Sequence, residues 1–237
     1  MNPRQLKLAD GHSIPYLLKV SANRRTIGLR VDASGLTVHI PKRVPASTVE
    51  NLLQEKSDWI RRKLSEWQEN RPQPFAWQDG ATLQYLGQDI LLTLRQDARN
   101  RALEFDGARL YVAQPNPVDI KSVQRKVTQW YAKQARADFT RRIELLAAKL
   151  GVPTPPVFLS NARTRWGSCN SRGEIRLHWR LIQAPPHIIH YVVAHELAHL
   201  KEMNHSPKFW AWVGKLCPDY ATARNDLKAI STTLHLL

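Results

Sequence analysis

The feature that most constrains this chain is an apolar segment, residues 185–200, which carries two histidines and a glutamate. The segment reads PPHIIHYVVAHELAHL. Its apolar residues lie almost all round a helix, and a helix of that kind is buried in a core. His195, Glu196 and His199 would then lie in the core, where polar and charged groups are costly without a partner. We therefore expect a globular fold whose buried helix binds a cation.

These three residues form the motif HExxH. Residues four apart lie on one face of a helix, so His195 and His199 can bind one metal ion. Glu196 lies about 100° round the helix from His195, close enough to reach a water on that metal. Zinc lowers the pKa of bound water to roughly 7, and a carboxylate can accept its proton. Given nine histidines in the chain, the motif would arise by chance roughly 0.01 times, which favours a real metal site.

A catalytic zinc site takes a third protein ligand and keeps its fourth position for water. His205 lies six residues after His199, in the turn-forming sequence NHSP. We therefore expect His195, His199 and His205 to bind one zinc ion per chain. The spacing matches that of the metzincin ligands, although Glu202 stands where those enzymes carry glycine. The alternative third ligands are Asp219 and Asp226.

Residues 1–115 are expected to form a β-rich N-terminal region with one long helix. The runs TIGLRV and LTVHI flank the turn DASG, and TLQYLGQDILLTL and ALEFDGARLYV form a second β segment. Between them, an S-x-x-E capping box at Ser47 and Glu50 predicts a helix to about Asn70. No internal repeat is visible. The breaker cluster QPNPV marks the expected boundary after residue 115.

Residues 116–237 are expected to form the metal-binding catalytic domain. A helical pattern with Asn116 as its cap continues to Leu150, where Gly151 ends it. Short strands fit VFLS and EIRLHWRL, and the metal helix is followed by KFWAWVGKL, capped by Ser206, and by a last helix. The predicted fold class is therefore α+β, a domain of helices and a small sheet preceded by the β-rich region.

The composition bounds the setting of the protein. A net charge of +15 attracts anions, so a nucleic acid or a nucleotide is a candidate partner, and solubility alone is the alternative explanation. No run of 18 apolar residues and no apolar leader are visible, so neither membrane insertion nor secretion is expected. The two cysteines, Cys169 and Cys217, form no CxxC pair. We expect a cytoplasmic protein.

The segments RTRWGSC, IRLHWRLIQAPPHIIHYVVAHELAHL and NHSPKFW together resemble the YgjP-like metallopeptidase family and, more distantly, SprT-type proteins. The similarity is strongest over residues 163–212. It implies a zincin-type fold in which His195, His199 and His205 bind zinc and Glu196 is the general base. It also implies that EIRLHWRL packs beside the metal helix, where zincins often use a strand edge to hold an extended peptide.

The stretch RTRWGSC supplies candidate substrate-binding residues. Arg165 and Trp166 can line the cleft, with Arg165 binding an anionic group and Gly167 permitting close backbone approach. The structural alternative places Trp166 in the core. Cys169 can reach the zinc and hold it inactive, or be a small buried thiol.

Three functions remain in competition. The favoured one is a zinc-dependent hydrolase, a metallopeptidase acting on proteins or peptides through a zinc-bound water activated by Glu196, with Tyr191 and Tyr220 as candidates for stabilising the oxyanion. The alternative is a metal-dependent phosphohydrolase, a pyrophosphatase acting on nucleotides, which the positive charge favours. The third is a nucleic-acid-associated protein with a structural zinc, although such sites are usually closed by four ligands.

Overall fold

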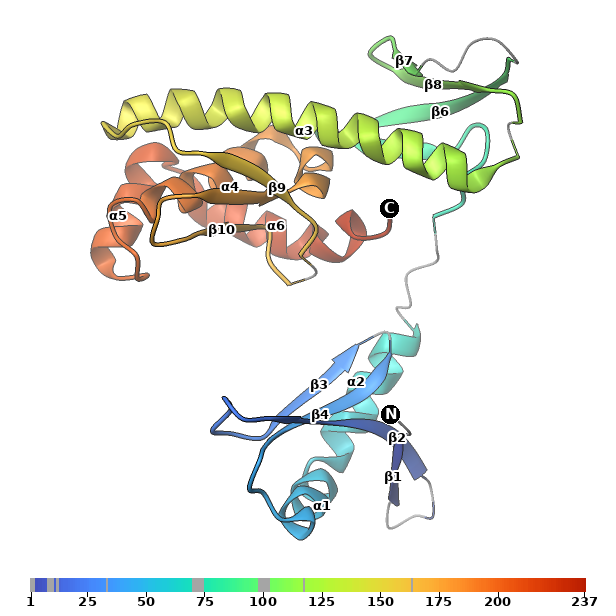
Figure 1. Cartoon of the computed structure of the whole chain (residues 1–237), viewed down its shortest axis with the longest axis vertical. Coiled ribbons are helices and arrows are strands. Elements are labelled where there is room, and N and C mark those ends of the chain that lie inside the picture. The colour runs from blue at the N-terminus through green and yellow to red at the C-terminus, as the bar shows by residue number, and fades with distance from the viewer. Residues whose placement is uncertain are drawn as a thin grey trace. The chain divides into compact units, whose positions relative to one another are not determined.

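The computed structural model contains two compact units, residues 1–73 (unit 1) and residues 74–237 (unit 2) (Figure 1). None of the helices in its described part combines the length and apolar character needed to cross a membrane. The side chains of residues 67 and 68 are not described. The structure describes residues 3–7, 11, 13–32, 34–69, 75–97, 103–116, 118–162 and 164–237.

Unit 1 is a sheet with helices packed on one face. The strands lie in the order β1-β2-β4-β3, with β2 and β4 parallel and the outer pairs antiparallel. Leu36 and Val38 from the sheet share a buried core with Leu53 and Ile60 from the helices. The described elements are β1 (Arg4–Lys7), β2 (Ser13–Ser21), β3 (Gly28–Asp32), β4 (Gly35–Pro41), α1 (Ala46–Glu55) and α2 (Ser57–Glu69).

The expected single helix of unit 1 is two helices. Helix α1 ends at Glu55 with Lys56 as its C-cap, and α2 then packs against β3 and β4. The expected capping box is wrong: Ser47 lies inside the first turn of α1, whose N-cap is Pro45, and no side chain caps the helix. The expected end near Asn70 lies outside the described residues.

Unit 2 begins with a second sheet, and the long helix α3 follows it. The strands lie in the order β5-β6-β8-β7. Helix α3 ends as expected at Leu150, where Gly151 takes the left-handed conformation, but it begins at Ile120 with Asp119, not Asn116, as its N-cap. The elements are β5 (Thr82–Tyr85), β6 (Gln88–Gln96), β7 (Leu103–Phe105), β8 (Arg109–Gln114) and α3 (Ile120–Leu150).

The boundary between the two compact units does not lie after residue 115, where the sequence predicts it. Leu92 and Leu110 from the second sheet lie in the same buried core as Val123 and Val127 from α3. The Tyr131 hydroxyl, also from α3, donates a hydrogen bond of 2.6 Å to a backbone carbonyl of β5. Strand β8 and helix α3 therefore belong to one core, and the division of the structure lies at residues 73 and 74.

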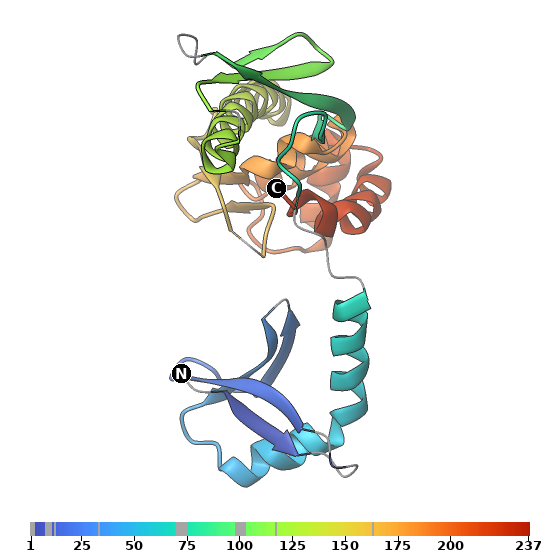
Figure 2. The same ribbon diagram turned by 90° about the vertical axis from the view of Figure 1, so that its right-hand side faces the viewer.

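The remainder of unit 2 packs along α3 (Figures 1 and 2). A small sheet in the order β10-β11-β9 lies beside α4, with β10 and β11 both in contact with this helix. EIRLHWRL was expected to be one strand, but it is strand β11 followed by a 3₁₀ helix, η1. The elements are β9 (Val157–Ser160), β10 (Gly167–Cys169), β11 (Ile175–His178), η1 (Trp179–Gln183), α4 (Pro186–Ala198), α5 (Pro207–Leu216) and α6 (Tyr220–Leu234).

The two four-stranded sheets have the same topology. Each has an antiparallel hairpin, a parallel pairing of the two central strands and a second antiparallel hairpin. The register also corresponds, because Leu29 pairs with Val38 and Leu103 pairs with Val112, 74 residues further along. Helices α1 and α3 likewise begin 74 residues apart. The expectation of no internal repeat is therefore wrong at the level of topology.

The β5–β6 turn fixes the second sheet against η1. The backbone N–H groups of Leu86 and Gly87 donate hydrogen bonds of 2.9 and 3.0 Å to carbonyls of Ile182 and Gln183. A Cβ on Gly87 would lie 2.8 Å from the Cα of Pro185, directly before α4. This contact ties the second sheet to the start of the metal helix.

We predict that Gly87→Ala destabilises unit 2 more than Gly80→Ala does. The two glycines have φ values of +77° and +76°, but a Cβ on Gly80 would meet nothing within 4 Å. Both variants lose about 1–2 kcal/mol of unfolding free energy from the left-handed backbone, and Gly87→Ala loses about 1–3 kcal/mol more from overpacking. Denaturant unfolding measures the difference, and equal losses would contradict the contact.

Candidate metal centre

Helix α4 carries the HExxH residues on a buried segment. Pro186 occupies its first turn, where a missing N–H costs nothing. The apolar residues predicted to surround the motif are buried, and Ile189 and Val193 are 0% exposed. The helix ends at Ala198, so His199 is its C-cap. The predicted burial is confirmed, while Asn204, expected to close the helix, lies in the turn beyond it.

His205 comes from the turn between α4 and α5. The Asn204 side chain accepts a hydrogen bond from the backbone N–H of Ser206 at 3.0 Å, and Ser206 caps α5 through Phe209 N at 3.3 Å. The buried ring of Phe209 then lies 4.6–4.9 Å, between centroids, from the three histidine rings. The capped start of α5 thus holds His205 against α4, and Phe209 is a supporting residue that sequence reasoning missed.

The structure brings His195, His199 and His205 together. One potential ligand atom from each lies within 4.8 Å of the others, and the Nε2 atoms of His195 and His205 are 3.1 Å apart. Two nitrogen ligands of a tetrahedral zinc, each about 2.0–2.1 Å from the metal, lie roughly 3.3 Å apart. The three donors therefore fit a zinc ion.

The protonation states of His195 and His199 also suit a metal, which binds the neutral imidazole. Burial lowers the pKa of His195 to about 4, and the neighbouring histidines add to the effect. Burial likewise lowers the pKa of His199, whose Nδ1 lies 3.2 Å from the Glu202 carbonyl oxygen. That carbonyl requires the proton on Nδ1 and leaves Nε2 free to coordinate.

The two alternative third ligands, Asp219 and Asp226, have other structural roles. Asp226 lies 2.9 Å from Nε2 of His187, and Asp219 is the N-cap of α6. Among the described residues, the groups of three or more candidate ligands reduce to the histidine triad. The geometry therefore favours His205 as the third ligand.

Glu196 is packed against the backbone of the adjacent strand. Its side chain is 6% exposed, and a Cβ on Gly167 of β10 would lie 2.3 Å from its Oε1. Burial raises the pKa of Glu196 to about 8, although the positive charge of Arg165 opposes the shift. A carboxyl group with a pKa near neutrality, beside three candidate ligands, is suited to accept and return a proton.

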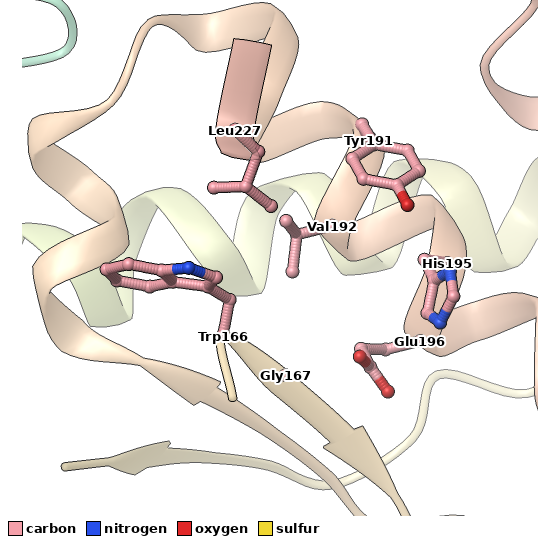
Figure 3. A pocket seen from close by; sticks show the side chains of 7 residues that line it. All are labelled: Trp166, Gly167, Tyr191, Val192, His195, Glu196 and Leu227. Atoms are coloured by element: carbon pink, nitrogen blue, oxygen red, sulfur yellow. The ribbon is translucent and has the colours of Figure 1, made fainter. Parts of the chain in front are cut away.

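A pocket of about 170 Å³ adjoins Glu196 (Figure 3). In this view the Glu196 carboxylate lies between His195 and the strand that carries Gly167, with the Trp166 indole on the other side of the pocket. Of the predicted substrate-binding residues, half-buried Trp166 lines the pocket, whereas Arg165 is exposed and acts on Glu196 through its charge. The pocket is lined by Trp166, Gly167, Tyr191, Val192, His195, Glu196 and Leu227.

The indole of Trp166 is fixed from the last helix. Its Nε1–H donates a hydrogen bond of 3.0 Å to the Ser231 hydroxyl, and His235 stacks on the ring at 4.5 Å between centroids. Leu227, also from α6, completes the wall. Sequence reasoning missed these contributions, because no local pattern in the chain connects α6 with β10.

The two candidate tyrosines and Cys169 differ in their surroundings. Tyr191 lines the pocket and lies 5.9 Å from His195 between ring centroids, while Tyr220 stacks on Trp210. The half-buried Cys169 thiol has a pKa raised first by burial and then by Glu196. Arg163 lies outside the described residues.

The free strand edge beside α4 differs from the one expected. Strand β11 from EIRLHWRL is paired on both sides, with β10 and with β9. Strand β10, from WGSC, is paired only with β11 within the described residues. The edge next to the metal centre therefore belongs to β10, because β11 folds into the middle of the sheet.

Comparisons with known proteins place this chain among related sequences. A family model described as "YgjP-like, metallopeptidase domain" matches residues 25–230. A UTP pyrophosphatase of Escherichia coli (strain K12) is 30% identical over 98 residues, which is 41% of this chain and 56% of that protein. A crystal structure of the abylysin metallopeptidase zymogen of Pyrococcus abyssi is 27% identical, with a TM-score of 0.36, over 40% of this chain and 94% of that one.

The α+β fold thus brings three histidines that could hold a metal ion beside a buried glutamate. Because the family match covers most of its length, this chain belongs to the YgjP-like metallopeptidase family. The predicted family and fold class are thus confirmed. The chain spans little more than half the length of the curated pyrophosphatase it matches.

We predict that the triad binds about one zinc ion per chain. The variant His195→Ala with His199→Ala should lose the metal, because one histidine cannot replace a three-ligand site. His187→Ala is the matched control, since His187 lies on the same helix and pairs with Asp226. Elemental analysis measures the stoichiometry, and full zinc in the double variant would exclude the triad as the metal site.

Proposed function

We propose that this chain is a zinc-dependent hydrolase in which His195, His199 and His205 bind the metal and Glu196 is the general base. The observation that carries the proposal is the buried Glu196 carboxyl group, which packs against Gly167 beside the three imidazoles. When bound, zinc would lower the pKa of a coordinated water to about 7 and polarise the bond to be broken. Glu196 would accept the proton of the attacking water and pass it to the leaving group.

The surroundings of Glu196 support this role. Contact with β10 limits the positions open to the carboxyl group, and orientation of this kind lowers the barrier of the reaction. Burial removes competing solvent, while a neighbouring cation favours the charged form that accepts a proton. Tyr191, on the pocket wall beside His195, is the better placed of the two tyrosines to donate a hydrogen bond to developing negative charge.

A peptide is the substrate that we favour. The free edge of β10 beside α4 can pair with an extended chain through backbone hydrogen bonds. The pocket between Trp166, Val192 and Leu227 can then accept an apolar side chain of that peptide. Both features lie next to Glu196, so a bound peptide would present its backbone to the metal centre.

A nucleoside triphosphate is the second candidate, with hydrolysis of a phosphoanhydride bond. The similarity to a UTP pyrophosphatase supports it. Two guanidinium groups also act electrostatically on the centre: Arg165 on Glu196, and Arg224 on His195. Such charges suit an anionic substrate, and in this case the Trp166 indole would contact the base.

The substrate class is decided by one panel. The zinc-loaded protein is incubated with denatured proteins and with nucleoside triphosphates that include UTP, and new peptide amino groups, phosphate and pyrophosphate are measured. We expect new peptide ends. Release of pyrophosphate without peptide cleavage would establish the second candidate. The absence of both activities, or activity that survives Glu196→Gln, would overturn the proposed hydrolase.

We predict that Glu196→Gln keeps the metal and lowers turnover by about 10²–10⁴-fold, because an amide cannot accept the proton. Gly167→Ala should also keep the metal and lose turnover, since the new Cβ displaces the carboxyl group. Gly214→Ala is the control, because its Cβ would make an ordinary contact of 3.7 Å with Tyr220. Metal content and initial rates are measured together, and a fully active Gly167→Ala would contradict the positioning.

A further inference from the structure

The sheet of unit 1 has one face covered by helices and one face without them. Leu36, Val38 and Ile40 of β4 point to the helices and are buried. Side chains alternate along a strand, so Thr37 and His39 point to the opposite face. The pairing of Lys19 and Gly28 with His39, and of Arg30 with Thr37, extends that second face over β2 and β3.

Positive charges gather on this second face around His39. Lys19 stands directly across the strand pair from His39. The Arg24 guanidinium lies over Gly28, with Nη2 2.5 Å from the position of a Gly28 Cβ, and Arg30 follows on the same strand. The pKa of His39 is lowered first by burial and then by the charges of these three residues. Cations from β2, from β3 and from the segment between them thus surround the His39 ring.

The rest of the face adds little negative charge. Lys7 of β1 joins it, because Lys7 pairs with Ser13 on the same side as Lys19. Asp32 is the acidic group among its described residues, and its carboxylate is bound to Arg30 at 2.8 Å and to Ser34. We call the surface formed by Lys7, Lys19, Arg24 and Arg30 the basic face.

The second sheet shows that this charge is not required by the fold. The corresponding register places Arg95 opposite Ala113, where unit 1 has Lys19 opposite His39. It places Glu104 opposite Tyr111, where unit 1 has Arg30 opposite Thr37. The Arg95 guanidinium stacks on Tyr111 at 3.9 Å. The same topology therefore folds with an acidic residue and an occupied arginine at these positions.

We propose that the basic face binds the phosphate backbone of a nucleic acid. Repeated cations are sufficient to bind phosphates, whereas a protein partner generally requires an apolar or aromatic anchor. The described residues of this face include no Phe, Tyr or Trp, and its His39 ring is half-buried between the cations, so recognition rests on phosphates and is tolerant of sequence. None of the residues assigned to hydrolysis belongs to this surface.

The experiment measures the salt dependence of binding to a fluorescein-labelled 20-nucleotide poly(U) RNA, and to oligo(dT) of equal length, by fluorescence anisotropy with the full chain. The test variant is Lys19→Gln, Arg24→Gln and Arg30→Gln. The control variant, Lys56→Gln, Arg62→Gln and Arg141→Gln, removes the same charge from exposed residues outside this sheet. Each lost phosphate contact reduces the steepness of the fall of log K with log salt by about one.

We expect the test variant to lose about two to three in slope and to bind about tenfold or more weakly at low salt, while the control keeps the wild-type slope. Equal losses in both variants would assign the binding to total charge and overturn the proposal. The absence of binding by the wild-type chain at low salt would also overturn it. So would competition by poly-glutamate that is stronger than competition by unlabelled RNA, since this indicates an acidic protein as partner.

A second measurement does not depend on how well the variants fold. RNA containing 4-thiouridine is crosslinked to the wild-type chain, and the crosslinked peptides are identified by mass spectrometry. We expect crosslinks to β2, β3 and the segment between them, residues 13–32. Crosslinks confined to the helices of unit 1 or to unit 2 would show that the basic face is not the binding surface.

Discussion

The candidate site depends on the close packing of one helix on one strand. Helix α4 approaches β10 so closely that Glu196 occupies the space of a side chain at position 167, and only glycine leaves that space open. This contact removes the carboxyl group from water and so raises its pKa. Burial of a carboxyl group is unfavourable without a partner charge, so the contact also explains why a cation belongs beside it. The turn that presents His205 and the Trp166 wall complete the same arrangement.

The local features of this arrangement could be predicted from the sequence. The all-round apolar pattern identified α4 as buried, and the four-residue spacing placed His195 and His199 on one side of it. Ser206 was recognised as a helix cap because its signal lies within a few residues. The contact of Gly167 with Glu196, and the support that Ser231 gives Trp166, join segments far apart in the chain. No short-range pattern records such contacts, so they required the structure.

The same distinction explains the two differences in architecture. Proline-rich breakers after β8 indicate that a strand ends, but they do not reveal whether the next helix packs on that strand, as α3 does. The strand order β10-β11-β9 likewise depends on pairings between separate segments, so the free edge was assigned to the wrong strand. The repeated topology was hidden because the two copies share their buried alternation and register, whereas their exposed faces differ, as Arg30 and Glu104 illustrate.

The repeated strand order has a consequence for how this polypeptide reaches its native state. Each central strand has two topologically equivalent partners in the same molecule, and misassembly through such exchange is a known failure of repetitive proteins. The differences between the copies oppose it. Strand β3 placed in the second sheet would put Arg30 in the place of Glu104, on the same face as Arg95, and β4 in the place of β8 would remove the Tyr111 ring on which Arg95 stacks. Each sheet would also meet the helices of the other copy, with the continuous helix α3 in the place of the pair α1 and α2. The sequence differences between the two sheets thus favour correct strand pairing while the chain folds.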